Sequence, residues 1–123
     1  MSGFNDLTKD AFLGGKVKLL QPKFGYRAGV DPVFLAASVN ATPGQSVLDL
    51  GCGVGAAALC LGARVPDVKL IGVERQPKYA ELARRNGLET VCADLSDLPD
   101  MTRQNQFDHV IANPPYFDRN ASV

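Results

Sequence analysis

The sequence predicts an α/β fold built on a Rossmann-like parallel sheet. Short apolar segments alternate with segments of helical pattern from Val47 onward, which is typical of parallel strands joined by right-handed crossovers. The stretch Val47–Gly55 is an apolar run that ends in an acid and continues into a tight glycine loop. A buried strand that feeds a helix through such a loop commonly passes a bound nucleotide. Acidic residues also end the next two predicted strands, which favours a ligand site over a plain turn.

The composition fits one ordinary globular domain. The chain has 123 residues and a formal net charge of zero, so any nucleic acid or anionic membrane would have to be met by a local patch. The longest apolar segment, Pro32–Val39, is too short to span a bilayer. The N-terminal residues lack the pattern of a secretion signal. We therefore expect a cytoplasmic protein without a membrane partner.

The cysteines show no pattern for cross-linking or metal binding. There are three of them, at Cys52, Cys60 and Cys92, and no two form a Cys-x-x-Cys pair. We therefore expect neither a disulfide framework nor a metal site. The same pattern is typical of a protein in a reducing compartment. Cys52 lies in the glycine loop and is expected to serve as a small apolar residue beside the ligand.

The N-terminal third is expected to form a hairpin, a loop and a helix. Two apolar-rich runs flank a Gly-Gly pair within Ala11–Leu20, which indicates a β-hairpin. The stretch Gln21–Gly29 is rich in turn residues and predicts a loop. Asp31 followed by proline is typical of a helix cap, and that helix should stop before Pro43. We therefore divide the chain into an N-terminal part, residues 1–45, and the N-terminal part of a Rossmann-like cofactor-binding domain, residues 46–123.

Four strands and two main helices are predicted in the second part. The strands are Val47–Leu50, Lys69–Glu74, Thr90–Asp94 and Phe107–Ala112, and the helices cover about residues 55–63 and 77–86. Residues 95–106 contain proline and many polar side chains, so any helix there is short. The usual order for this fold places the first strand centrally, the second and third to one side and the fourth to the other.

The carboxyl ends of the predicted strands carry candidate ligand-binding residues. In a doubly wound sheet the ligand lies at these ends, and here they carry Asp49, Glu74, Asp94 and Asn113. Glu74 is close to the spacing at which a carboxylate accepts hydrogen bonds from ribose hydroxyls. Asp94 is suited to an adenine amino group, with the Leu95 backbone beside it. Asp49 is suited to a positively charged end of the ligand.

The position of Asp49 separates two classes of cofactor. The pattern Gly51-x-Gly53-x-x-Ala56 nominally fits a dinucleotide fingerprint, but a pyrophosphate at this loop would be repelled by the carboxylate. S-adenosylmethionine brings an ammonium, a sulfonium and no phosphate. The residues therefore favour S-adenosylmethionine over NAD, with Gly51 and Gly53 giving the close approach to the main chain.

Four motifs together resemble those of class I S-adenosylmethionine-dependent methyltransferases. They are Asp49–Gly55, the acid Glu74, Ala93–Leu95 and the Asn-Pro-Pro-Tyr segment Asn113–Tyr116. The last, an NPPY motif, is typical of the branch that methylates amino groups of adenine, guanine or protein glutamine. The upstream segment Gly25–Ala37 is similar to the entry segment of the bacterial "methyltransferase small" group, which includes valine tRNA adenine-N6 methyltransferases.

This resemblance implies a function and several site residues. It implies an enzyme, an S-adenosylmethionine-dependent N-methyltransferase, which acts on an exocyclic amine, with adenine in tRNA as the expected RNA substrate and S-adenosylhomocysteine as product. Alternatives are rRNA guanine, protein glutamine, or a catalytically silent module that only binds the cofactor. Arg27 and Asp31 in the entry segment, with Asn113, join the expected cofactor contacts.

The NPPY motif has a chemical rationale. An aromatic amine is a poor nucleophile because its lone pair is delocalised into the ring. The Asn113 side-chain oxygen and the Pro114 carbonyl can accept the amine hydrogens and so localise that lone pair. Pro114 and Pro115 stiffen the turn that holds these acceptors, and Tyr116 can stack on the flat substrate, which is worth about 1–3 kcal/mol per base.

Other candidates favour structural interpretations. His109 is expected to be packed or at the rim of the fourth strand, and Tyr79 and Leu82 are expected to make core contacts. A modest basic cluster near the N-terminus is interpreted as a solvated face, with contact to RNA phosphates as the alternative. Its members are Lys16, Lys18, Lys23 and Arg27.

The resembling family normally has seven strands, whereas this chain ends just after the fourth predicted strand. We expect a domain truncated at that point, either a fragment or a natural short form. The strand Phe107–Ala112 would then lack its outer neighbour, and a free apolar edge invites pairing with a second copy of the chain. The expectation is a homodimer that binds the cofactor without transferring a methyl group.

Overall fold

The computed structural model describes residues 6–23, 30–103 and 106–112. The strands are β1 (Leu7–Phe12), β2 (Val17–Pro22), β3 (Ser46–Leu50), β4 (Lys69–Glu74), β5 (Thr90–Cys92) and β6 (His109–Ala112). The helices are α1 (Val30–Ser38), α2 (Ala56–Arg64) and α3 (Pro77–Arg85), and two short 3-10 turns are η1 (Leu13–Gly15) and η2 (Asp100–Thr102).

The central sheet has the strand order β5-β4-β3-β6, and every pairing in it is parallel. This is the predicted order, with the first strand of the Rossmann-like part in the middle. Leu48 of β3 lies between Ile71 of β4 and Val110 of β6. Because the strands are parallel, β3 and β4 end at the same edge of the sheet, where the glycine loop begins.

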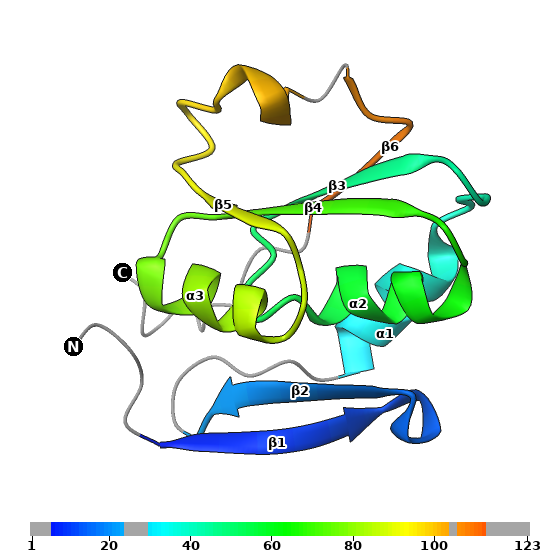
Figure 1. Cartoon of the computed structure of the whole chain (residues 1–123), viewed down its shortest axis with the longest axis vertical. Coiled ribbons are helices and arrows are strands. Elements are labelled where there is room, and N and C mark those ends of the chain that lie inside the picture. Colours follow the sequence, from blue (N-terminus) through cyan, green and yellow to red (C-terminus); the bar gives the residue numbers. More distant parts are fainter. Residues whose placement is uncertain (1–5, 24–29, 104–105, 113–123) are drawn as a thin grey trace.

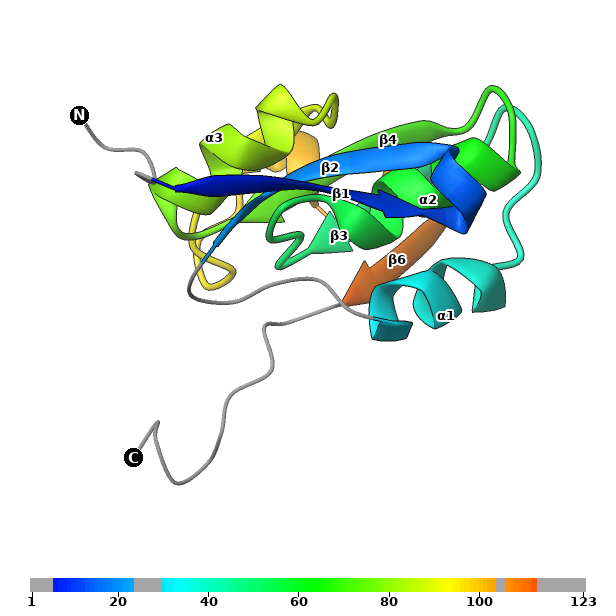
Figure 2. The ribbon, with the colours of Figure 1, turned by 90° about the horizontal axis from the view of Figure 1, so that it is seen from below.

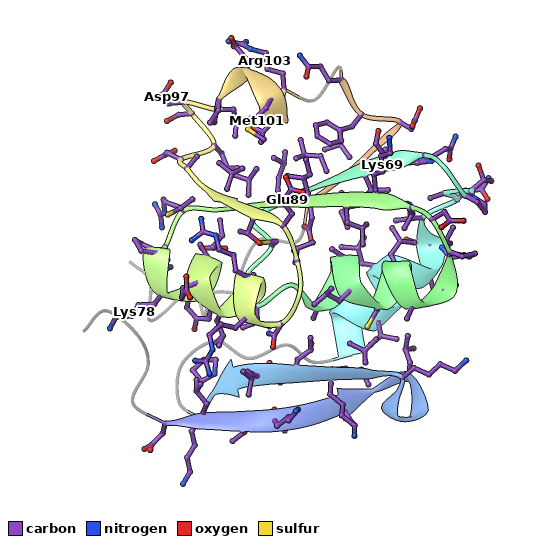
Figure 3. The ribbon with its side chains drawn as sticks, viewed as in Figure 1. Lys69, Lys78, Glu89, Asp97, Met101 and Arg103 are labelled. Carbon is purple, nitrogen blue, oxygen red and sulfur yellow. The ribbon has the colours of Figure 1, made fainter. Side chains whose placement is uncertain are left out.

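The two faces of the sheet are covered differently (Figure 1). Helices α1, α2 and α3 lie on one face, and the β1–β2 hairpin lies beyond them as an additional layer. The other face is covered by the segment between β5 and β6, which carries Asp97, Met101 and Arg103 (Figure 3). Under that segment, Leu98 and Phe107 pack against the buried residues Leu48, Leu50 and Val73.

The hairpin forms as predicted but is longer. β1 and β2 are antiparallel, with Lys9 opposite Leu20, and η1 makes the connection. Gln21 and Pro22 belong to β2 and are buried, so the prediction of a loop from Gln21 onward was wrong at its first two residues. Strand β2 continues because its inward side chains, Val17, Leu19 and Gln21, are buried against the helical layer. Figure 2 shows β1 and β2 crossing over α2 and α3.

Helix α1 begins one residue earlier than the expected cap. Its first residue is Val30, so Asp31 lies within the helix and does not precede it as an N-cap. The carboxyl end of α1 is held by Arg64 of α2, whose guanidinium donates hydrogen bonds to the carbonyls of Ala36 and Val39. Those bonds join the two helices on the same face of the sheet.

Helices α2 and α3 match the prediction closely. Gly55 caps α2 in a left-handed conformation, with a φ of 94°, and Pro77 is the first residue of α3. Tyr79 and Leu82 are buried in the core, as expected.

Two strands are shorter than the sequence predicts. β5 ends at Cys92 because Asp94 folds into a turn and accepts hydrogen bonds from the backbone and hydroxyl of Ser96. β6 begins at His109 because the Asp108 carboxylate accepts the Ser46 N–H at 2.8 Å, in place of a strand-to-strand bond. Among the described residues, no helix is long and apolar enough to cross a bilayer.

Candidate functional site

The glycine loop is fixed to the neighbouring strand by its backbone. The N–H groups of Gly51 and Cys52 both donate to the carbonyl of Val73, at 2.8 and 3.0 Å. Gly51 and Gly53 have φ values of 74° and 57°, a region that side chains disfavour. The loop therefore leaves β3 in a sharp, defined turn and starts α2 at the edge of the sheet.

Glu74, the last residue of β4, holds the tip of this loop. Its Oε1 accepts the Gly53 N–H at 2.9 Å, and its Oε2 accepts the Gln76 N–H at 2.9 Å. The side chain is 6% exposed. The sequence predicted Glu74 as a ribose-binding acid but gave no signal for this second role in shaping the loop.

Asp49 lies on β3, two residues before the loop begins at Gly51, and is completely buried. Among the described residues, neither of its carboxylate oxygens has a hydrogen-bond partner. Burial, together with the nearby Glu74 charge, raises its pKa from 3.8 to about 8, and the N–H of Ala58 opposes this only in part. A buried carboxyl without a partner is costly to a fold, so it marks a functional site more often than a structural one.

Cys52 fills the space between the loop and β4. Its side chain is 3% exposed, and a Cβ atom placed on Gly72 would lie 2.7 Å from its Sγ. Burial raises the pKa of the Cys52 thiol, and the neighbouring Asp49 and Glu74 charges raise it further. Cys52 is therefore a small neutral packing residue, as expected, and its contact with a ligand stays a prediction.

Asp94 and Leu95 lie one strand further along the sheet edge. The segment is tied to β4 by the Ala93 N–H, which donates to the Glu74 carbonyl at 3.1 Å. Asp94 is exposed, and its hydrogen bonds from Ser96 lower its pKa. Leu95 is 50% exposed. Both residues therefore face solvent beside Glu74, as a contact to a ligand requires.

The structure thus brings Asp49, Gly51, Gly53 and Glu74 together at the ends of β3 and β4. Other predicted site residues lie outside the described residues, namely Arg27, Asn113, Pro114, Pro115 and Tyr116. Asp31 is placed only as part of helix α1. The residue before Asn113, Ala112, pairs with Leu50 and so lies at the same edge as the glycine loop.

The remaining candidates lie away from this edge. His109 starts β6 opposite Val47, and its Nε2 is 2.9 Å from the Gln45 Oε1, which confirms a packed rim position. Lys16, Lys18 and Lys23 are exposed on or beside the hairpin, and Lys9 joins them. Within the described part of the chain, no three His, Cys, Asp or Glu side chains are grouped so as to hold a metal ion.

Comparison with known proteins agrees with this geometry. Residues 28–123 match the model of the methyltransferase small domain family. A tRNA1(Val) (adenine(37)-N6)-methyltransferase from Flavobacteriaceae bacterium strain 3519-10 is 34% identical over 112 residues, which are 87% of this chain and 48% of the relative. The release factor glutamine methyltransferase of Escherichia coli K12 is 38% identical over 76 residues, which are 58% of this chain and 27% of that protein.

A solved structure shows the same fold. The crystal structure of TrmN from Thermus thermophilus superposes with a TM-score of 0.59 at 26% identity, over 73% of this chain and 29% of that one. The Rossmann-like class expected from the sequence is therefore confirmed. The chain spans less than half the length of these relatives.

Proposed function

Because the chain belongs to the methyltransferase small domain family, we propose that it forms the S-adenosylmethionine-binding part of an N-methyltransferase that acts on an exocyclic amine. The family expected from the sequence is thereby confirmed. The observation that carries the proposal is the buried Asp49 next to a glycine loop, with no hydrogen-bond partner for its carboxylate among the described residues.

The environment of Asp49 supports this cofactor over a dinucleotide. A pyrophosphate at the loop would add negative charge beside Asp49 and Glu74, whose electrostatic interaction already disfavours ionisation of Asp49. A ligand with an ammonium and a sulfonium relieves that repulsion and favours the ionised carboxyl. Asp49 is completely buried, so it would act on the ligand through its charge and not through direct contact.

Glu74 and Asp94 would hold the adenosine part of the cofactor. An ionised carboxylate offers about four acceptor positions, and Glu74 uses two of them for Gly53 and Gln76. The others can accept ribose hydroxyls. Asp94 is exposed to solvent, and hydrogen bonds from Ser96 lower its pKa. Its carboxylate would accept a hydrogen bond from the adenine amino group beside Leu95.

The acceptor we favour is adenine in tRNA. The tRNA-modifying relatives match most of this chain, whereas the glutamine-modifying relative matches a shorter part of it. Asn113 and Pro114 would accept the amine hydrogens, Pro115 would keep the turn rigid, and Tyr116 would stack on the base. These residues would align the amine for in-line transfer of the methyl group of the bound cofactor, and this alignment would supply most of the rate gain. A tRNA substrate would place the reaction in the cytoplasm.

Two observations bear on partners. The exposed lysines of the hairpin, Lys9, Lys16 and Lys18, could meet RNA phosphates. Strand β6 is the last strand of its sheet among the described residues, and Val110 on it is 39% exposed. A second copy of the chain could pair there and give a homodimer.

The test is calorimetric titration with S-adenosylmethionine, S-adenosylhomocysteine and NAD, followed by transfer of labelled methyl groups to total tRNA, rRNA or release factor. Binding of the first two and not of NAD is expected, and label should enter adenine of tRNA when the protein encoded by the complete reading frame is used. Label in release factor would support the glutamine alternative. Binding without any transfer by the protein encoded by the complete reading frame would support the silent module.

A further inference from the structure

Asn86 joins three segments that are far apart in the sequence. It follows the last residue of α3, and its side chain is half-buried. Its Oδ1 accepts the Leu20 N–H of β2 at 2.7 Å, and its Nδ2 donates to the Leu20 carbonyl at 3.0 Å. The same Nδ2 donates to the Val54 carbonyl in the glycine loop at 3.0 Å.

We propose that Asn86 is a positioning residue that couples the N-terminal hairpin to the glycine loop. Through Asn86, the hairpin would hold the loop in the conformation that binds the cofactor, and a bound cofactor would in turn stabilise the hairpin. This inference rests on the proposed cofactor site. It gives the hairpin a role in cofactor binding, although none of its residues belongs to the sheet edge where the ligand is expected.

The Asn86 carboxamide makes the two backbone hydrogen bonds with Leu20 that a neighbouring strand would otherwise make. Both backbone groups of Leu20 that point away from β1 are satisfied by one side chain, through a paired donor and acceptor. Only Asn combines one acceptor and two donors on a stem this short. Asp would keep the acceptor and lose both donors, which would leave a carboxylate facing two carbonyls.

The Val54–Gly55 peptide lies outside the helices and strands. The Gly55 N–H is held by a turn bond to the Cys52 carbonyl at 2.9 Å, and the Val54 carbonyl is held by Asn86. Val54 lies between Gly53 and Gly55, both of which have positive φ values. The Gly53 N–H on one side is held by Glu74, and the Val54 carbonyl on the other is held by Asn86. Loss of the second bond would let the loop sample conformations that cannot bind, and affinity falls in proportion to the competent fraction.

The hairpin does not depend on Asn86 for its attachment. Val17 and Leu19 are buried in the main core together with residues of α1 and α2. A variant at residue 86 should therefore fold. A matched control is Arg64, whose guanidinium also donates to two main-chain carbonyls across a helix interface but belongs to the far end of α2 from the loop.

The experiment compares Asn86→Asp with Arg64→Met by calorimetric titration with S-adenosylhomocysteine. We expect affinity to fall roughly tenfold in Asn86→Asp and less than twofold in Arg64→Met, while both lower the thermal midpoint. Equal affinity in Asn86→Asp and the wild type would overturn the inference. A wild type that does not bind at all would overturn the proposed function, and the inference with it.

A measurement on the wild type covers the case in which Asn86→Asp does not fold. Amide exchange followed by NMR should show that S-adenosylhomocysteine slows exchange of the Leu20 N–H several-fold. The Lys16 N–H, which is bonded to the Leu13 carbonyl within the hairpin turn, should exchange at the same rate with and without ligand. Unchanged Leu20 exchange in the ligand-bound protein would overturn the coupling.

Discussion

The Glu74 carboxylate accepts the Gly53 N–H at 2.9 Å, so the end of β4 fixes the tip of the loop that follows β3. This side chain shapes the loop, and it is also the acid that we propose for the ribose. A change at Glu74 would therefore alter the loop as well as the proposed ribose contact, and the two effects have to be separated by measurement.

Replacement of Glu74 by Ala should weaken S-adenosylmethionine binding by about 1.5–3 kcal/mol, because a hydrogen bond to a charged acceptor is lost. It should also lower stability, since the Gly53 and Gln76 N–H groups lose their acceptor. Glu74→Gln is the matched variant, because it keeps the shape and one backbone bond. Calorimetric affinities that are the same in all three proteins would sink the ribose assignment.

Asp49 should make stability fall as the pH rises. Its pKa is about 8 in the folded protein and 3.8 ordinarily, so between these values the folded state holds a proton that the unfolded state has released. The free energy of unfolding then decreases with pH across this window, by at most about 1.4 kcal/mol per pH unit. Asp49→Asn should lack this slope. Denaturant titrations at pH 5 to 8 would measure the free energy of unfolding of both proteins. The same dependence of this free energy on pH in the wild type and in Asp49→Asn would contradict the prediction.

The same group links cofactor binding to pH. A cationic ligand stabilises ionised Asp49, so binding near pH 7 should release a proton, and affinity should rise as the pH approaches 8. The Glu74 charge acts against ionisation of Asp49, and the neutral Cys52 thiol adds no charge. Calorimetry in buffers of different ionisation enthalpy would measure the proton directly. The Asp49→Asn protein is the control and should release none through this group.

Gly72 should resist substitution because Cys52 packs against it. An Ala Cβ would lie 2.7 Å from the Cys52 Sγ and 2.8 Å from the Leu88 Cδ2, so Gly72→Ala should cost about 1–3 kcal/mol of stability. Cys52→Ala in the same chain should recover part of that loss. Gly62→Ala is the control, since its Cβ meets only the end of the flexible Leu70 side chain. Strict additivity of the Gly72 and Cys52 changes would argue against the contact.

The sequence predicted the sheet and the loop better than the hydrogen bonds that join them. Strand order, helix positions and the grouping of Asp49 with Glu74 follow from periodicity and from the rule that parallel strands end at one edge. The hydrogen bonds of Asn86 to Leu20 and Val54 could not be predicted from the sequence. Asn86 followed by Gly is a common way to end a helix, so the pattern indicated only a helix end. The burial of Gln21 was not predicted for a related reason. The turn-forming residues that follow it indicated a loop, whereas packing against the helices extends β2 to Pro22.

Asn113 should be required for transfer and not for cofactor affinity. In the protein encoded by the complete reading frame, Asn113→Ala would remove the acceptor that we propose for the substrate amine. We expect a loss of about 10²–10³ in rate, comparable to loss of one donor from an oxyanion hole. Calorimetry should show cofactor affinity within a few-fold of the wild type. An enzyme that remains active after this change would refute the amine-alignment mechanism.

The free side of β6 should pair with a second copy of this chain. β6 hydrogen-bonds only β3 among the described residues, and its side chains alternate between the buried Ile111 and the exposed Val110. An apolar strand with unpaired backbone groups favours association, and a lysine placed on such a strand opposes it.

Sedimentation of the 123-residue chain should therefore show a dimer at high concentration, and Val110→Lys should weaken that dimer. Leu13→Lys is the control, since Leu13 is similarly exposed, at 37% against 39%, but lies in the hairpin turn. The same preparation should bind S-adenosylhomocysteine without methylating tRNA. A chain that stays monomeric at high concentration would defeat the edge argument, and measurable turnover would show that these residues suffice for transfer.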